Sequence, residues 1–154
     1  MLNAADYARI SQTAPYEAQA IGLHRAYNVI KGVYDFAVDG GAVGQINLKD
    51  DKGNLISLPV GAIVTKAYID VITTLTSGGS ATIAVGAQAS GDLLAATAVA
   101  SWAAGLLAAD AVGTVATMKK IATSDKPLRL DIAVAALTAG KAKVFIEYVL
   151  SDAS

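Results

Sequence analysis

The stretch "ITTLTSGGSATIAVG", Ile72–Gly86, carries the clearest fold signal in the chain. Two adjacent glycines, Gly78 and Gly79, separate two runs in which β-branched and apolar residues alternate with other residues. A period of two is typical of β-strands, because successive side chains of a strand point to opposite faces. Two glycines in a row suit a tight turn, because glycine adopts positive φ without a steric penalty. The stretch therefore predicts a β-hairpin that turns at Gly78 and Gly79.

Similar runs follow one another from Gly32 to the end of the chain, separated by turn residues. The last predicted hairpin pairs Leu128–Val134 with Val144–Leu150 around the turn sequence "LTAGK". Earlier strand-like runs lie at 33–39 ("VYDFAVD"), 43–49 ("VGQINLK"), 55–58 and 63–75, and a later one lies at 114–122 ("TVATMKKIA"). About eight strands without a long helix predict an all-β antiparallel β-sandwich, and strands of such mixed length favour its jelly-roll form. The strand order stays open at this point.

Some segments allow two interpretations or depart from the strand pattern. "SGDLLAATAVASW", Ser90–Trp102, reads as a helical turn capped by Ser90 and followed by a strand that enters Trp102. "SDKP", Ser124–Pro127, predicts a turn. Residues 1–32 show no clean period of two and contain Pro15, so they predict an irregular N-terminal arm, followed by a sandwich domain over 33–154.

The composition limits the kinds of partner that this domain can bind. The 154 residues suffice for one domain, and only 16% of them are charged while 54% are hydrophobic. The formal net charge of −1 provides no basic field for nucleic acid, so we expect no nucleic-acid partner. The Ala-rich stretch 93–116 is long enough to cross a bilayer, but it is poor in large apolar residues and contains Asp110, so we expect no membrane partner.

The sequence offers no recognisable catalytic or metal-binding constellation. There is no cysteine, which is compatible with synthesis in a cytosol, and the single histidine, His24, lies in the predicted arm. "KDDKGN", Lys49–Asn54, lacks the bidentate glutamate of a calcium loop and predicts a solvated turn. We therefore expect no enzyme activity, no cofactor and no metal. Carboxylates on strands, which a glycosidase would need in pairs, are explained as the polar members of alternating strands: Asp35, Asp39, Asp70, Asp131 and Glu147.

Three segments together carry a family resemblance. These are "VYDFAVDGGAVGQINL" (33–48), "GAIVTKAYIDVITTLTSGGSATIAVGA" (61–87) and "LRLDIAVAALTAGKAKVFIEYVLSD" (128–152). They resemble segments of head decoration proteins, also called cement proteins, of tailed bacteriophages and of related β-rich virion proteins. The resemblance covers about four-fifths of the chain, Val33–Asp152. It implies a jelly-roll body on the outside of a capsid that forms small symmetric oligomers and ties neighbouring major capsid subunits together.

The arm suits such a role, because a segment that becomes ordered on a partner can cover more surface than a globule can. Tyrosine and arginine are enriched at interface hot spots. We therefore expect partner contacts, with the major capsid protein or with sibling subunits of a homodimer or homotrimer, from Tyr7, Arg9, Tyr16, Arg25 and Tyr27. A second interpretation is that some of these side chains pack the arm onto its own sandwich.

Two other functions compete with this one. A fibre or tail-associated module that binds a receptor or glycan would need exposed loops rich in aromatic residues. The single tryptophan, Trp102, lies in an Ala-rich segment and is expected in the core, which favours the decoration protein. A hydrolase is disfavoured by the shortage of histidine and cysteine.

Overall fold

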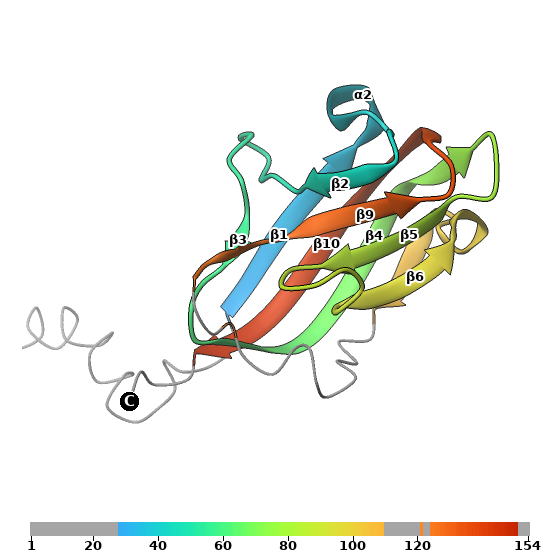
Figure 1. The fold of residues 1–154 in the computed structure, drawn as a ribbon. Coiled ribbons are helices and arrows are strands. Elements are labelled where there is room, and N and C mark those ends of the chain that lie inside the picture. Colours follow the sequence, from blue (N-terminus) through green and yellow to red (C-terminus); the bar gives the residue numbers. More distant parts are fainter. Residues whose placement is uncertain (1–27, 110–120, 122–123, 151–154) are drawn as a thin grey trace, which may run out of the picture.

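The computed structural model describes residues 28–109, 121 and 124–150. Within these residues the chain forms two four-stranded antiparallel sheets (Figure 1). The first sheet has the order β1 (Asn28–Asp35), β10 (Leu137–Leu150), β4 (Ala62–Ser77), β7 (Gly105–Ala109). The second sheet has the order β2 (Gly44–Asn47), β9 (Arg129–Ala133), β5 (Thr82–Gly86), β6 (Leu94–Ala98). Two short strands, β3 (Ser57–Leu58) and β8 (Lys126–Pro127), pair beside them.

The two sheets lie face to face and enclose one core (Figure 1). The first sheet supplies alternate side chains of its central strands, such as Ile69 on β4 and Val144 on β10, which are fully buried. The second sheet supplies Ile83 and Leu130 in the same way. Trp102 is fully buried between them, and its indole N–H donates to the hydroxyl of Thr97 at 2.9 Å. The predicted antiparallel β-sandwich and the core position of Trp102 are both confirmed.

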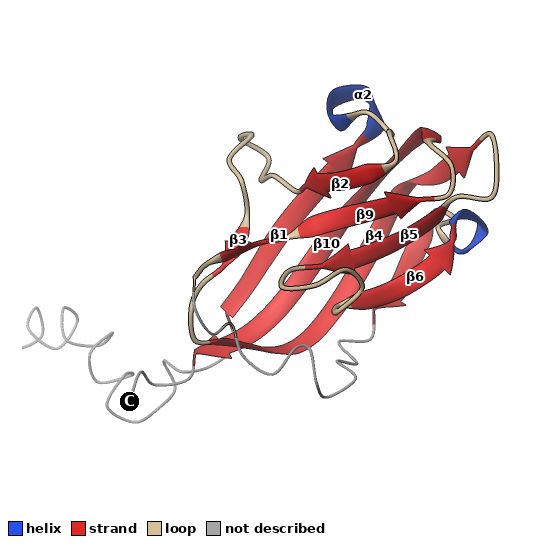
Figure 2. Cartoon of the chain, viewed as in Figure 1, coloured by secondary structure: helices blue, strands red, loops and turns tan. Residues whose placement is uncertain are grey.

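Helices are short in the described part of the chain, as Figure 2 shows. They are a four-residue helix, α2 (Phe36–Asp39), and a single 3₁₀ turn, η2 (Val99–Ser101). None of the described helices is long and apolar enough to cross a membrane.

The turn at Gly78 and Gly79 connects the two sheets, so the predicted hairpin is wrong. The strand before it, β4, lies in the first sheet and pairs with β10 and β7, whereas β5 lies in the second sheet and pairs with β6 and β9. Neither glycine has a positive φ. A period of two shows only that one face of each run is buried. The same alternation arises whether the two runs pair with each other in one sheet or pack against each other from opposite sheets. The alternation therefore located both strands without revealing their partners.

The last predicted hairpin fails for the same reason. The chain crosses from β9 in the second sheet to β10 in the first, and the residues predicted to turn, Leu137–Lys141, are the beginning of β10. The reversal comes earlier, around Val134, which has a φ of 71°. Gly140 instead occupies an irregularity in the β10–β4 register, and its φ of 129° explains why glycine is found there.

Three local predictions also need correction. The strand expected over 33–39 ends at Asp35, whose carboxylate accepts the backbone N–H of Ala37 at 3.1 Å and caps α2. The loop after β5 is closed by buried Asp92 in place of the expected cap at Ser90, because the Asp92 carboxylate accepts three backbone N–H groups, from residues 87, 88 and 89. Two residues of the expected turn "SDKP" form β8. The strand expected over 114–122 lies outside the described residues, apart from buried Ile121.

Gly32 was expected to end the arm, but it lies inside β1. Asn28–Gly32 already pair with Val144–Tyr148 of β10, so the strand begins five residues before Val33, where the sandwich was expected to begin. A side chain at position 32 would lie 2.8 Å from Cβ of Leu48, which is closer than real Cβ atoms approach. The glycine is required by the close packing of β1 on Leu48.

We predict that Gly32→Ala destabilises the fold by about 1–3 kcal/mol, because an added methyl group overpacks a full core. Gly78→Ala is the matched control, since open space surrounds Gly78 and its φ is not positive. The control should change the free energy of unfolding by less than about 0.5 kcal/mol. Urea denaturation of the two variants and the parent measures both changes, and equal effects at the two positions would contradict the packing of Gly32.

Candidate functional site

The predicted contact residues lie outside the part of the chain that the structure describes. They all fall within residues 1–27: Tyr7, Arg9, Tyr16, Arg25 and Tyr27, together with His24. Their role as contact residues stays a prediction. The described residues present two other surfaces, a charged groove beside β1 and the outward face of the first sheet.

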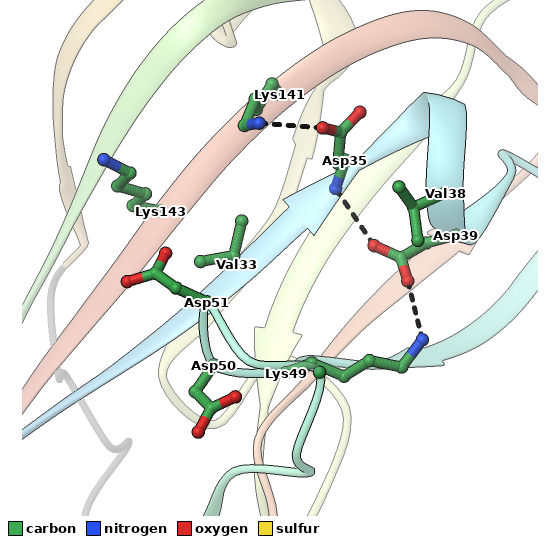
Figure 3. A pocket seen from close by; sticks show the side chains of 10 residues that line it. Val33, Asp35, Val38, Asp39, Lys49, Asp50, Asp51, Lys141 and Lys143 are labelled. Carbon is green, nitrogen blue, oxygen red and sulfur yellow. Dashed lines mark hydrogen bonds and ion pairs between the residues drawn. The ribbon is translucent and has the colours of Figure 1, made fainter.

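The charged groove lies where β1, α2, β10 and the turn after β2 meet (Figure 3). It has a volume of about 440 Å³. Four aspartates and three lysines line it, together with two valines and a glycine: Asp35, Asp39, Asp50, Asp51, Lys49, Lys141, Lys143, Val33, Val38 and Gly53.

Hydrogen bonds to nearby backbone groups hold Asp35, Asp39 and Asp50 in their positions in the groove. Asp35 ends β1 and caps α2, and the Asp39 carboxylate at the end of α2 reaches back to accept the backbone N–H of Asp35 at 3.0 Å. Asp50 closes the polar turn, because one carboxylate oxygen accepts the backbone N–H groups of Lys52 and Asn54, each at 2.8 Å. The Asn54 amide donates to its other oxygen at 2.9 Å. The expectation of a turn in "KDDKGN" is confirmed.

Lysines from β1, β10 and the turn after β2 pair with three of the carboxylates in the groove. Lys141 on β10 pairs with Asp35 at 2.8 Å, and Lys49 pairs with Asp39 at 3.0 Å, as the dashed lines in Figure 3 mark. A third lysine, Lys31 on β1, pairs with Asp51. The network therefore ties α2 and the polar turn to the first sheet.

The electrostatics of the groove oppose acid–base chemistry. The hydrogen bond from Lys141 holds the pKa of Asp35 below its usual value, and the pKa of Asp51 is lowered in the same way by Lys31. The pKa of Asp50 is lowered by its hydrogen bonds from Asn54. A glycosidase needs one carboxyl group whose pKa is raised so that it can donate a proton at neutral pH. The resolved shifts among these acids run in the other direction, so the arrangement acts as a clamp between elements.

We predict that Asp35→Asn reduces the loss of stability on acidification. A carboxylate whose folded pKa is lowered stabilises the fold above its unfolded pKa of about 3.9, and this contribution is lost as pH falls through the folded pKa. Because the pair with Lys141 is partly exposed, the contribution should not exceed about 1 kcal/mol. Thermal unfolding at pH 7 and pH 2.5 measures it. The assignment fails if parent and variant lose the same stability between these pH values.

Tyr34 lies on β1 between the groove residues Val33 and Asp35, and its side chain is fully buried. Its hydroxyl donates to the backbone carbonyl of Gly40 at 2.8 Å and thereby fixes the chain where it leaves α2. Burial raises the pKa of Tyr34 to about 12, and the nearby charges of Asp39 and Asp35 add to this rise.

The raised pKa of Tyr34 predicts an alkaline loss of stability. The unfolded chain loses the phenol proton near pH 10, whereas the folded chain keeps it until about pH 12, so stability is complete below pH 10 and falls between these values. Tyr34→Phe should weaken the fold by about 1 kcal/mol at pH 7 and should show a shallower decline from pH 10 to 12. Urea midpoints across this range provide the measurement. Parallel declines for parent and variant would contradict the assignment.

The outward face of the first sheet is the second surface, which we call the outer face. Its residues alternate with core residues along each strand, and the registers place them in rows across the sheet. One row contains Lys31, Phe145 and Tyr68, and the next contains Val33, Lys143, Asp70 and Leu106. Tyr68 and Phe145 stack with ring centroids 5.1 Å apart and an interplanar angle of 12°. The sequence pattern contained a signal for this surface, since Phe145 interrupts an otherwise polar side of its strand.

Comparisons with known proteins give the fold a context. The sequence matches no family model and no curated protein. The structure is similar to a chain of the cyanophage Pam1 capsid asymmetric unit, with a TM-score of 0.59 and 21% identity over 81% of this chain and 85% of that chain. It is also similar to a chain of the capsid of Ralstonia phage GP4, with a TM-score of 0.54 and 23% identity over 83% of this chain and 88% of that chain. At these identities the likeness shows a shared fold.

Proposed function

We propose that this chain is a structural protein of a phage virion that decorates the outside of the capsid. It binds major capsid subunits and its own copies, and so reinforces the shell. The observation that carries the proposal is the sandwich shared with chains from two phage capsids, which spans more than four-fifths of this chain and of each of those chains. The sequence resemblance to decoration proteins supports the finer role and the jelly-roll form. The strand distribution is compatible with that form, since a jelly roll has eight strands in two sheets.

The chemistry of the described surfaces supports a binding role. Three carboxylates of the charged groove pair with lysines of the same chain, and the pKa values of Asp35, Asp50 and Asp51 are all lowered. The three lowered pKa values mean that Asp35, Asp50 and Asp51 are poorly suited to donate a proton at neutral pH. The outer face instead presents the stacked rings of Tyr68 and Phe145 on paired strands, and aromatic residues are enriched at interfaces.

The alternative is a fibre or tail-associated module that binds a receptor or glycan. Its best candidate platform in the sequence, Trp102, is fully buried and bonded to Thr97. The stacked Tyr68 and Phe145 rings lie on strands of a sheet rather than on loops. Both observations favour the decoration role over the alternative.

The N-terminal segment is proposed as the clamp onto capsid subunits. Its boundary follows from the structure, because Asn28 pairs with Tyr148 and a deletion beyond Tyr27 would remove residues of β1. Removal of residues 1–27 therefore leaves every described strand complete.

We predict that the variant lacking residues 1–27 keeps the stability of the sandwich but binds capsid shells at least tenfold more weakly. Shells that carry the major capsid protein but lack this chain are titrated with parent and variant, and bound protein is measured by cosedimentation. A full-length variant with Tyr7, Tyr16 and Tyr27 changed to alanine should bind with intermediate affinity, since aromatic anchors dominate interfaces.

Unchanged affinity of the truncated variant would show that residues 1–27 are not the clamp. Failure of the full-length chain to bind any shell, together with selective binding to a glycan array, would overturn the decoration role and favour the receptor module.

A further inference from the structure

The outer face of the first sheet carries four charged residues that form no ion pair among the described residues. Lys66 and Asp70 on β4 and Lys143 and Glu147 on β10 all point outward, because each alternates with buried residues of its strand. Within the described residues the side chains of these four form no ion pair, whereas Asp35, Asp39 and Asp51 at the border of the same sheet all do. The centre of the outer face is therefore rich in charges that remain available to a partner.

Apolar groups are exposed on the same face. Leu106 on β7 is 82% exposed and Val29 on β1 is 54% exposed. The stacked rings of Tyr68 and Phe145 lie between the charged rows. Beside them a shallow depression of about 410 Å³ is lined by Lys66, Tyr68, Leu106, Leu107 and Glu147.

The registers give this face an unusual symmetry. Across the line between β10 and β4, Glu147 lies beside Lys66, Phe145 beside Tyr68, and Lys143 beside Asp70. One strand further out, Val33 on β1 and Leu106 on β7 lie in the same row as Lys143 and Asp70. Two rows thus pair opposite charges across this line, one row pairs two aromatic rings, and the row of Lys143 adds two aliphatic side chains, whereas Lys141 lies beside Thr73 and Lys31 lies opposite Ala108.

We propose that the outer face binds a second copy of this chain about a two-fold axis. The axis runs parallel to the strands, between β10 and β4, in the plane of the interface. Rotation about it places β10 of one copy over β4 of the other, so that Glu147 faces the other copy's Lys66 and Lys143 faces its Asp70. Phe145 then meets Tyr68 of the second copy, and Val33 meets Leu106, at the spacing of about 10 Å that packed sheets adopt.

The charge pattern favours a second copy over a different partner. A two-fold interface is self-complementary, because residue i contacts j and residue j contacts i. On this face two rows each pair a lysine with an acidic residue across the axis, Lys66 with Glu147 and Lys143 with Asp70, and this arrangement meets the condition. Each of the ion pairs between copies forms twice, so one reversed charge introduces two repulsive contacts.

This inference rests on the proposed function only because it assigns to the outer face the contact that a decoration protein makes with its own copies. It is tested in solution without capsids. Two variants are made, Lys143→Glu and Asp70→Lys. Sedimentation velocity over a range of concentrations should show a parent dimer, and each variant should dimerise at least tenfold more weakly, because like charges then face each other twice. Circular dichroism and thermal unfolding show that both variants remain folded.

Mixing the two variants is the decisive experiment. In the mixed dimer the glutamate introduced at position 143 of one copy faces the lysine introduced at position 70 of the other, and the unchanged Asp70 and Lys143 face each other. Association should therefore return to within about threefold of the parent. Lys52→Glu, an exposed position in the polar turn, carries the same change in charge as Lys143→Glu. This control should dimerise like the parent, and mixing it with Asp70→Lys should not restore tight association.

A monomeric parent at every concentration would overturn the proposal, as would a dimer that neither variant weakens. Rescue by the Lys52→Glu control to the same extent would show that net charge, rather than the pairing of positions 143 and 70, drives association. None of these outcomes depends on capsid binding, so the decoration role can stand or fall separately.

Discussion

The register of β10 against β4 is the constraint on which the rest of the structure depends. These two long strands form the centre of the first sheet, and their pairing sets Val144 beside Ile69 on the inner face and Lys143 beside Asp70 on the outer face. Because side chains alternate with a period of two, a slip of one residue on either strand would move its buried residues outward and its charges into the core. The cost of burying unpaired charges makes this register strongly favoured.

The core and the outer face follow from this pairing. On the inner face it supplies a layer of aliphatic side chains that the second sheet covers, with Trp102 between the sheets. On the outer face it fixes the rows that carry the proposed two-fold contact. On its other side β10 pairs with β1, and this second pairing brings Lys141 to Asp35, which attaches α2 to the sheet and completes the charged groove. A protein that acts by presenting rigid surfaces to capsid subunits and to its own copies would need this kind of framework, since positions on paired strands vary little.

The sandwich could be predicted from the sequence because the signal for a strand, the alternation of buried and exposed residues, lies within the strand itself. Alternation located β4 and β10 and implied two sheets, and the deep burial of Trp102 followed from its apolar surroundings. The pairing of strands could not be predicted, because a short connection such as 78–81 serves a hairpin and a crossing between sheets equally well. The bulge at Gly140 and the positive φ of Val134 were hidden for a related reason: they reflect how β9 and β10 join opposite sheets. The charged groove brings together residues more than one hundred positions apart, such as Asp35 and Lys141, so no local sequence pattern could predict it.

The register itself is open to direct measurement by nuclear Overhauser spectroscopy of the isotope-labelled full-length chain. The account predicts backbone contacts between β4 and β10 that link Tyr68 with Phe145, Ile69 with Val144 and Asp70 with Lys143. Contacts displaced by one residue, linking Ile69 with Lys143 or Phe145 as direct partners, would contradict it, and with it the division of this sheet into a core face and a binding face.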